Sequence, residues 1–218
     1  MYPSISLDGR YVAFASSATN LVPGDTSYGD VYDRQTDTIE KVSVATDGTA
    51  ANNGSSTPAI SGDGRYVAFE SMSPDLAPGD TGYDMDIFVR DRQAGTTELV
   101  SVDNNENEVT GWSYAPSITA DGRYVAFCST ASTLVPGDTN GVYDIFVRDR
   151  VTHTTYRLSL DTAGGDPNSY SYYPAIAAYG PYPVAFESAA SDLVAGDTNG
   201  KRDIFLVFTS PLAVRWPR

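Results

Sequence analysis

The chain has 218 residues, of which 28 are acidic and 14 are lysine or arginine, so its formal net charge is −14. This acidic balance argues against a nucleic-acid partner, because no basic excess exists to release counterions from phosphates. One cysteine excludes a disulfide framework and a CxxC-type zinc site, and one histidine argues against His-rich metal centres and Ser-His catalysis. No apolar run reaches the roughly 18 residues of a membrane-spanning helix.

The predicted elements follow one plan, which the first copy illustrates. A short strand begins at Pro3, and an Asp-Gly-Arg turn at residues 8–10 leads to a β-branched and aromatic strand over residues 11–14. A long connection with Gly-Asp-Thr at residues 24–26 precedes a third strand near Asp30. A Thr-rich turn then precedes a fourth strand over residues 40–44. The pattern predicts four short antiparallel strands.

This series recurs along the chain. The leading prolines are Pro3, Pro58, Pro116 and Pro174, so successive copies start 55, 58 and 58 residues apart. The Gly-Asp-Thr anchor begins at Gly24, Gly79, Gly137 and Gly196. The aspartate of the third strand recurs at Asp86, Asp144 and Asp203, with Asp30 as a weaker counterpart. We therefore divide the single domain into repeats 3–57, 58–115, 116–173 and 174–218.

The repeats predict an all-β protein, because no window has a helical apolar period of useful length. Four antiparallel strands every 55–58 residues are typical of a propeller blade with one enlarged loop. One such sheet cannot bury both of its faces, so neighbouring sheets must stack on it. The expected fold is a β-propeller of four four-stranded blades. A β-sandwich with internal duplication is the alternative, although its strands seldom repeat so faithfully.

The run P-x-I-S-x-D-G-R-Y-V-A-F followed by D-I-F-V-R-D-R resembles the TolB-like, or WD-like, bacterial β-propeller repeat. Copies two and three carry the full pattern, copy one lacks part of the third strand, and copy four lacks the Asp-Gly turn. The resemblance implies a propeller, usually of about six to eight blades, in an extracytoplasmic bacterial protein. It implies no reaction, since related propellers include interaction platforms, sugar-binding modules, peptidase gates and some enzymes.

Four copies leave three interpretations open: a fragment of a longer protein, a true four-bladed ring, or a half-ring that pairs with a second copy. The divergent tail and the absence of a signal peptide before the first repeat favour the fragment. An uncapped blade would expose apolar surface and favour homo-oligomerisation, and residues 212–216 could supply a last strand. The two lysines, the single cysteine and the acidic balance agree with an extracellular or periplasmic location.

Alternate connections of an up-and-down sheet share an edge, so both long connections of each copy must open on one face, where binding is expected. Its best candidate metal ligands are loop oxygens, including the Val142 carbonyl. They belong to Asp80, Asp84 and Asp86 in copy two, to Asp138, Asn140, Val142 and Asp144 in copy three, and to Asp197, Asn199 and Asp203 in copy four. Oxygens at alternate positions of a glycine-bent loop suit Ca²⁺. The alternative is that these side chains cap tight turns.

Aromatic residues also gather before the later prolines. They are Trp112 and Tyr114 before Pro116, and Tyr170, Tyr172 and Tyr173 before Pro174. Aromatic loops on a propeller face can stack on sugar rings or hold a peptide. The alternative is that alternate residues of a strand beginning here pack inward.

Catalysis has less support in the sequence. His153 lies in a turn on the short-loop face, and Cys128 stands where Glu70 and Glu187 occur in other copies. The two glutamates could serve glycoside chemistry only if the fold brought them within about 5–10 Å. The first hypothesis is therefore a non-catalytic module that presents one face to a protein or glycan and binds calcium. The alternative is a secreted hydrolase or lyase that acts on a polysaccharide or ester from that face.

Overall fold

The computed structural model describes residues 3–18, 20–22 and 30–208. Within these ranges the chain forms antiparallel sheets in strict chain order and contains no helix, which confirms the all-β prediction. Blade 1 contains β1 (Ser4–Ile5), β2 (Tyr11–Phe14), β3 (Asp30–Asp33) and β4 (Thr38–Lys41). Blade 2 contains β5 (Ser55–Ile60), β6 (Tyr66–Ser71), β7 (Asp86–Asp91) and β8 (Thr96–Leu99).

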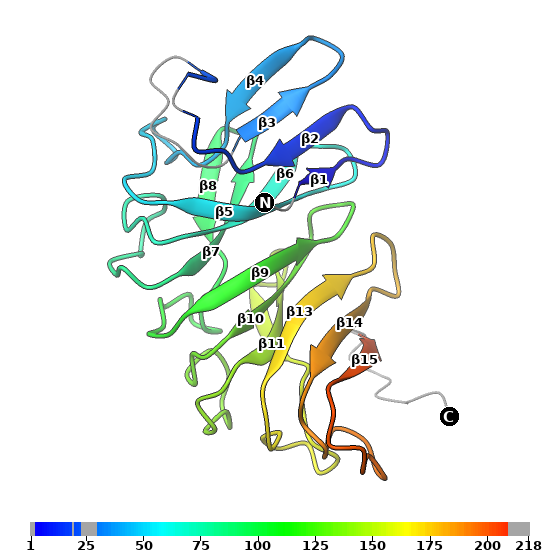
Figure 1. Cartoon of the computed structure of the whole chain (residues 1–218). Coiled ribbons are helices and arrows are strands. Elements are labelled where there is room, and N and C mark those ends of the chain that lie inside the picture. The colour runs from blue at the N-terminus through cyan, green and yellow to red at the C-terminus, as the bar shows by residue number, and fades with distance from the viewer. Residues whose placement is uncertain (1–2, 19, 23–29, 209–218) are drawn as a thin grey trace.

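The later sheets repeat this order. Blade 3 contains β9 (Ser113–Ile118), β10 (Tyr124–Ser129), β11 (Asp144–Asp149) and β12 (Thr154–Arg157), and blade 4 contains β13 (Ser171–Ile176), β14 (Pro183–Ser188) and β15 (Asp203–Phe208). Figure 1 shows the sheets following one another from the N-terminal to the C-terminal end. The first strands β1, β5, β9 and β13 contact one another in turn and so form the inner rim. The four repeated sheets make a β-propeller architecture, as the spacing predicts.

The first strand of each later blade runs through its proline. The prediction that this strand starts at the proline is wrong for blades 2 to 4, where it starts three residues earlier, at Ser55, Ser113 and Ser171. Proline offers no N–H to the ladder, so the pairing shifts register there. The residues just before the prolines have positive φ values of 49–54° and form the bulge: Thr57, Ala115 and Tyr173.

Apolar side chains on the facing sheets form the core between blades. Ala68, Ile87 and Val89 of blade 2 share one buried cluster with Ile118, Val125 and Phe127 of blade 3. Each of the last three blades also stacks one phenylalanine of its second strand on one of its third strand, at 5.8–5.9 Å between ring centroids. Because both faces of an inner sheet are covered, its second and third strands are almost wholly buried.

A tyrosine, two arginines and a glycine join neighbouring blades at the short-loop edge. The guanidinium groups of Arg65 and Arg150 both lie over the Tyr66 ring of blade 2, at 4.7 and 4.6 Å from the ring centroid. Gly122 of blade 3 packs against the same ring. The set recurs around Tyr11. The Asp-Gly-Arg turn therefore also contributes to packing between blades.

The outer faces of the terminal blades differ from the inner ones. Ile204 and Leu206 of β15 are 74% and 42% exposed, whereas their blade 3 counterparts Ile145 and Val147 are buried. Ile5 of β1 is 58% exposed. Homo-oligomerisation through these faces stays a prediction. The strand predicted at residues 212–216 and the first Gly-Asp-Thr anchor lie outside the described residues. Within the described part, no helix is long and apolar enough to cross a membrane.

Candidate functional site

Both long connections of blades 2 and 3 open at the same edge. In blade 2, residues 72–85 join β6 to β7 and residues 100–112 join β8 to β9. Ser71, at the end of β6, pairs with Asp86 at the start of β7 and with Ser55 at the start of β5. We call this edge the long-loop face, and its existence confirms the prediction made from alternating loop lengths.

A row of aromatic rings crosses the long-loop face. It consists of Trp112, Tyr114, Tyr143, Tyr170, Tyr172 and Tyr173. Ring centroids are 6.1 Å apart between Trp112 and Tyr114, 6.0 Å between Tyr114 and Tyr143, and 4.7 Å between Tyr143 and Tyr172. Sequence reasoning found the five residues that lie before Pro116 and Pro174, two of them just ahead of β9 and β13 and three within these strands. It missed Tyr143, which precedes β11 and links the two groups.

Four tyrosines of this row line a cavity of about 510 Å³ between blades 2, 3 and 4, here called the tyrosine pocket. Its lining is completed by Thr57, Glu70, Ala115 and Cys128. Trp112 and Tyr173 are 49% and 66% exposed, so the row is accessible from outside. Burial raises the pKa of Tyr114, Tyr143 and Tyr172 above the usual tyrosine value, so their hydroxyls stay protonated at neutral pH and can donate hydrogen bonds.

Glu70 fixes one wall of the tyrosine pocket. Its Oε1 accepts hydrogen bonds from the Ser56 and Thr57 hydroxyls, both at 2.7 Å. Its Oε2 accepts one from the Ala115 N–H of blade 3 at 3.0 Å. The carboxylate thus satisfies polar groups at two bulges and connects two blades.

The counterparts of Glu70 also have structural partners. Cys128 donates to the Tyr114 carbonyl at 3.4 Å, and burial raises the pKa of its thiol to about 12. The thiol is therefore protonated at neutral pH and is a poor nucleophile. Glu187 pairs with Arg202 at 2.8 Å. His153 is 66% exposed, in the turn between β11 and β12 on the short-loop edge.

Three carboxylates of blade 2 meet at the long-loop face. Asp80 and Asp86 each place an oxygen within 4.8 Å of the other's and of one from Glu108. Glu108, which sequence reasoning missed, accepts hydrogen bonds from the Thr81 and Gly82 N–H groups. Burial raises the pKa of Asp80 to about 6 and of Asp86 to about 7, and their neighbouring carboxylates add to the effect. Asp84 accepts instead from the Gly111 N–H at 3.0 Å.

Blade 3 places an arginine among the corresponding carboxylates. Arg157 Nη1 lies 3.2 Å from Asp138, 3.6 Å from Asp144 and 2.5 Å from Asp166. Burial raises the pKa of Asp144 to about 6, although Arg157 and the Ser159 hydroxyl oppose the rise. In blade 3, a side chain of the protein itself supplies the cation.

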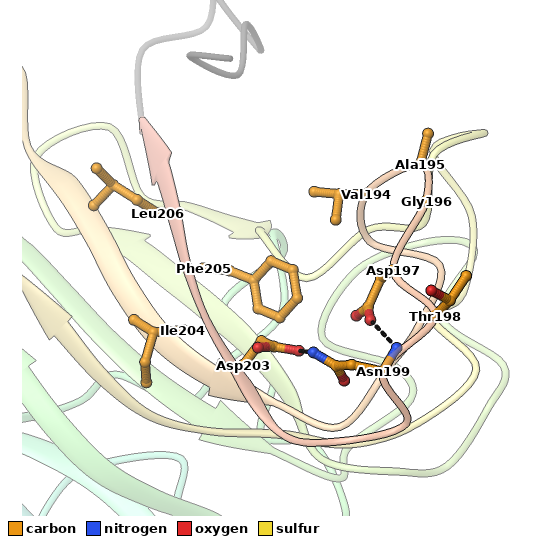
Figure 2. Close-up of a pocket in the computed structure, with 10 residues that line it drawn as sticks. All are labelled: Val194, Ala195, Gly196, Asp197, Thr198, Asn199, Asp203, Ile204, Phe205 and Leu206. Atoms are coloured by element: carbon orange, nitrogen blue, oxygen red, sulfur yellow. Dashed lines mark hydrogen bonds between the residues drawn. The ribbon is translucent and has the colours of Figure 1, made fainter.

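The asparagines of these loops form hydrogen bonds within their own turns, and the Asn140 amide also donates to the Pro167 carbonyl of the β12–β13 loop at 3.4 Å. Asn140 accepts from the Val142 N–H at 3.1 Å. Figure 2 shows the blade 4 loop, where the Asn199 amide donates to Asp203 at 2.8 Å and the Asn199 N–H to Asp197 at 3.4 Å. These contacts agree with turn capping, the alternative to metal binding. A second cavity of about 510 Å³ lies beside this loop, against the outer face of blade 4.

Solved structures with this architecture share little sequence with the chain. TolB from Acinetobacter baumannii aligns with a TM-score of 0.56 and 16% identity over 95% of this chain and 40% of that chain. A TolB from Agrobacterium tumefaciens, described as putative, aligns with a TM-score of 0.53 and 20% identity over 95% of this chain and 57% of that chain. For dipeptidyl peptidase 4 from Porphyromonas gingivalis, the TM-score is 0.53 and the identity 15%, over 95% of this chain and 31% of that chain. The chain therefore has a TolB-like β-propeller fold, and it spans roughly half the length of the TolB proteins or less.

No family model and no curated protein sequence matches the chain. At these identities the structural likeness shows the fold alone. The activities named for the peptidase therefore do not carry over to this chain.

Proposed function

We propose that the chain is a non-catalytic binding module that holds a glycan, or a peptide segment of a protein, in the tyrosine pocket. The observation that carries this proposal is the unbroken row of six aromatic rings beside a cavity of about 510 Å³. Aromatic faces offer apolar area for sugar or proline rings, and phenol hydroxyls offer hydrogen bonds to hydroxyl or carbonyl groups. The Glu70 carboxylate disfavours anionic ligands, so a neutral ligand is expected.

The pocket chemistry favours binding over hydrolysis. A hydrolase needs a nucleophile or a carboxylate pair that is free to act on substrate. Glu70 already accepts three hydrogen bonds, and the Cys128 thiol is buried and protonated. An extracellular or periplasmic location agrees with this role and stays a prediction.

Calorimetric titration of variants tests the proposal. The probes are cellohexaose, xylohexaose, chitohexaose and mannohexaose, together with a proline-rich decapeptide. Tyr143→Ala removes the ring that links the two aromatic groups, and we expect it to weaken binding of the active probe about tenfold or more, since one ring contact contributes roughly 0.5–1.5 kcal/mol beyond its buried area. Tyr156→Ala on the outermost strand β12 is the control, because that ring is 45% exposed and lies away from the pocket.

The outcomes separate the ligand classes. Heat from a hexasaccharide identifies a glycan module, and heat from the decapeptide alone identifies a peptide module. If none of the probes binds at millimolar concentration, the proposal is wrong. Equal effects of Tyr143→Ala and Tyr156→Ala would also contradict it, because the pocket would then make no special contribution.

A further inference from the structure

Blades 2 and 3 place three carboxylates at equivalent positions of the repeat, an arrangement here called the carboxylate frame. Asp80, Asp86 and Glu108 stand 58 residues before Asp138, Asp144 and Asp166. The supporting hydrogen bonds also correspond at this spacing. Ser101 donates to Asp86 as Ser159 donates to Asp144, and Thr81 donates to Glu108 as Thr139 donates to Asp166. The two carboxylate triads are therefore structurally equivalent.

The carboxylate frame of blade 2 has no counterpart of Arg157. The residue 58 positions before Arg157 is Leu99, whose side chain packs against the apolar cluster of Phe69 and Phe88. No arginine, lysine or histidine of the described residues forms an ion pair with Asp80, Asp86 or Glu108, as Arg157 does with the blade 3 triad. Like charges held this close without a counterion are unfavourable in a buried setting.

Two of the blade 2 carboxylates also have unused acceptor capacity. Asp86 is 1% exposed, and only one of its oxygens accepts a hydrogen bond from a described side chain or loop N–H, from Ser101 at 2.6 Å. Asp80 is 8% exposed, and its one such bond is a long contact of 3.3 Å from the Gly82 N–H. Both residues are more than nine-tenths buried, and each brings a carboxylate oxygen into the cluster.

We propose that blade 2 binds a calcium ion between Asp80, Asp86 and Glu108, where blade 3 holds the guanidinium of Arg157. Three carboxylate oxygens within 4.8 Å of one another can surround an ion whose bonds to oxygen measure about 2.3–2.6 Å. A purely oxygen-based set that carries three negative charges selects a hard cation. Mg²⁺ demands near-ideal octahedral geometry and keeps several of its waters, whereas Ca²⁺ accepts irregular sets of carboxylate oxygens. The ion would tie the β6–β7 loop to the β8–β9 loop, as Arg157 ties those of blade 3.

Calcium titration of purified protein tests this site. We expect the wild type to bind Ca²⁺ in calorimetry at least tenfold more tightly than Mg²⁺, and to melt at a higher temperature in CaCl₂ than in EDTA. Glu108→Gln keeps the shape of the half-buried side chain and should weaken Ca²⁺ binding at least tenfold. Asp47→Asn removes the same charge from an exposed turn and should change the affinity less than twofold.

A reciprocal exchange provides the second test. Leu99→Arg supplies blade 2 with its own cation, so the calcium stoichiometry should fall by one ion per chain. Arg157→Leu removes the cation from the carboxylate frame of blade 3, so the calcium stoichiometry should rise by one ion per chain. If either exchange prevents folding, the comparison of Glu108→Gln with Asp47→Asn decides.

Four results would overturn the proposal. They are equal melting temperatures in CaCl₂ and EDTA, equal affinities for Ca²⁺ and Mg²⁺, equal calcium affinities of Glu108→Gln and Asp47→Asn, and an unchanged stoichiometry in a folded Leu99→Arg variant. None of these readouts depends on the ligand of the tyrosine pocket, so the two proposals can fail separately.

Discussion

Substituting Gly122 by alanine should expose how much the short-loop edge contributes to stability. Gly122 has a φ of +70°, and an added Cβ would lie 2.1 Å from Cδ2 of the Tyr66 ring. That ring also contacts the guanidinium groups of Arg65 and Arg150, so moving it aside would disturb both contacts. The substitution therefore combines backbone strain with a steric clash across the interface between blades 2 and 3.

Gly95 separates these two effects, because it has the same φ of +70° and its added Cβ would meet no atom closer than 3.9 Å. We expect Gly95→Ala to cost about 1.5 kcal/mol from backbone strain alone. Gly122→Ala should cost about 3.5 kcal/mol, because overpacking adds roughly 2 kcal/mol. For a chain of this size, the melting temperature should fall by about 5 °C for Gly95→Ala and about 10 °C for Gly122→Ala.

Differential scanning calorimetry and urea unfolding of both variants would measure these losses. Tyr66→Ala combined with Gly122→Ala removes the clash, so the double variant should be more stable than the sum of the single losses implies. Equal losses for Gly95→Ala and Gly122→Ala would refute the reasoning, because the ring contact would then contribute nothing.

Two further predictions concern carboxylates that join elements. Glu70→Ala leaves the Ala115 N–H and two hydroxyls without an acceptor, so urea unfolding should show a loss of about 1–3 kcal/mol, against less than about 1 kcal/mol for Glu187→Ala at an exposed ion pair. Burial raises the pKa of Asp149, but hydrogen bonds from Arg123 and from backbone N–H groups outweigh it and lower the pKa to about 2. Because the folded pKa lies below the unfolded value of 3.8, this stabilisation is present above about pH 4 and is lost as the pH falls through 2. Unfolding at pH 5 and pH 2.5 should therefore show a smaller gap between wild type and Asp149→Asn at the lower pH, and an unchanged gap would contradict the assignment.

The strands and blades could be predicted from the sequence because they depend on local spacing. The Asp-Gly-Arg turn and the strand after it lie within about ten residues, so the local sequence of each copy is enough to predict them. The position of Pro58 inside β5 could not be predicted this way, since the bulge at Thr57 depends on pairing with β6. Proline alone indicates only an edge strand.

The candidate sites combine residues from several loops, and this limits what the spacing predicts. Tyr143 joins the aromatic row only because β11 starts beside the bulges of β9 and β13. Glu108 lies in the loop after β8, 28 residues from Asp80, so the Gly-Asp-Thr pattern does not include it. Aligning copies two and three position by position would have found it, because Asp166 stands 58 residues later.

The differences between equivalent positions say more about function than the shared pattern does. The shared residues, such as the tyrosine that packs against the next glycine turn, explain how one blade attaches to another. Blades 2 and 3 keep equivalent carboxylates but differ by one positive charge, because Leu99 in blade 2 stands where Arg157 stands in blade 3. The proposed calcium ion would supply in blade 2 the positive charge that the Arg157 guanidinium supplies in blade 3. At the position of Glu70 and Cys128, one blade forms three hydrogen bonds and the next places a buried thiol. That asymmetry gives the tyrosine pocket a carboxylate on the blade 2 side and a thiol at the equivalent position of blade 3.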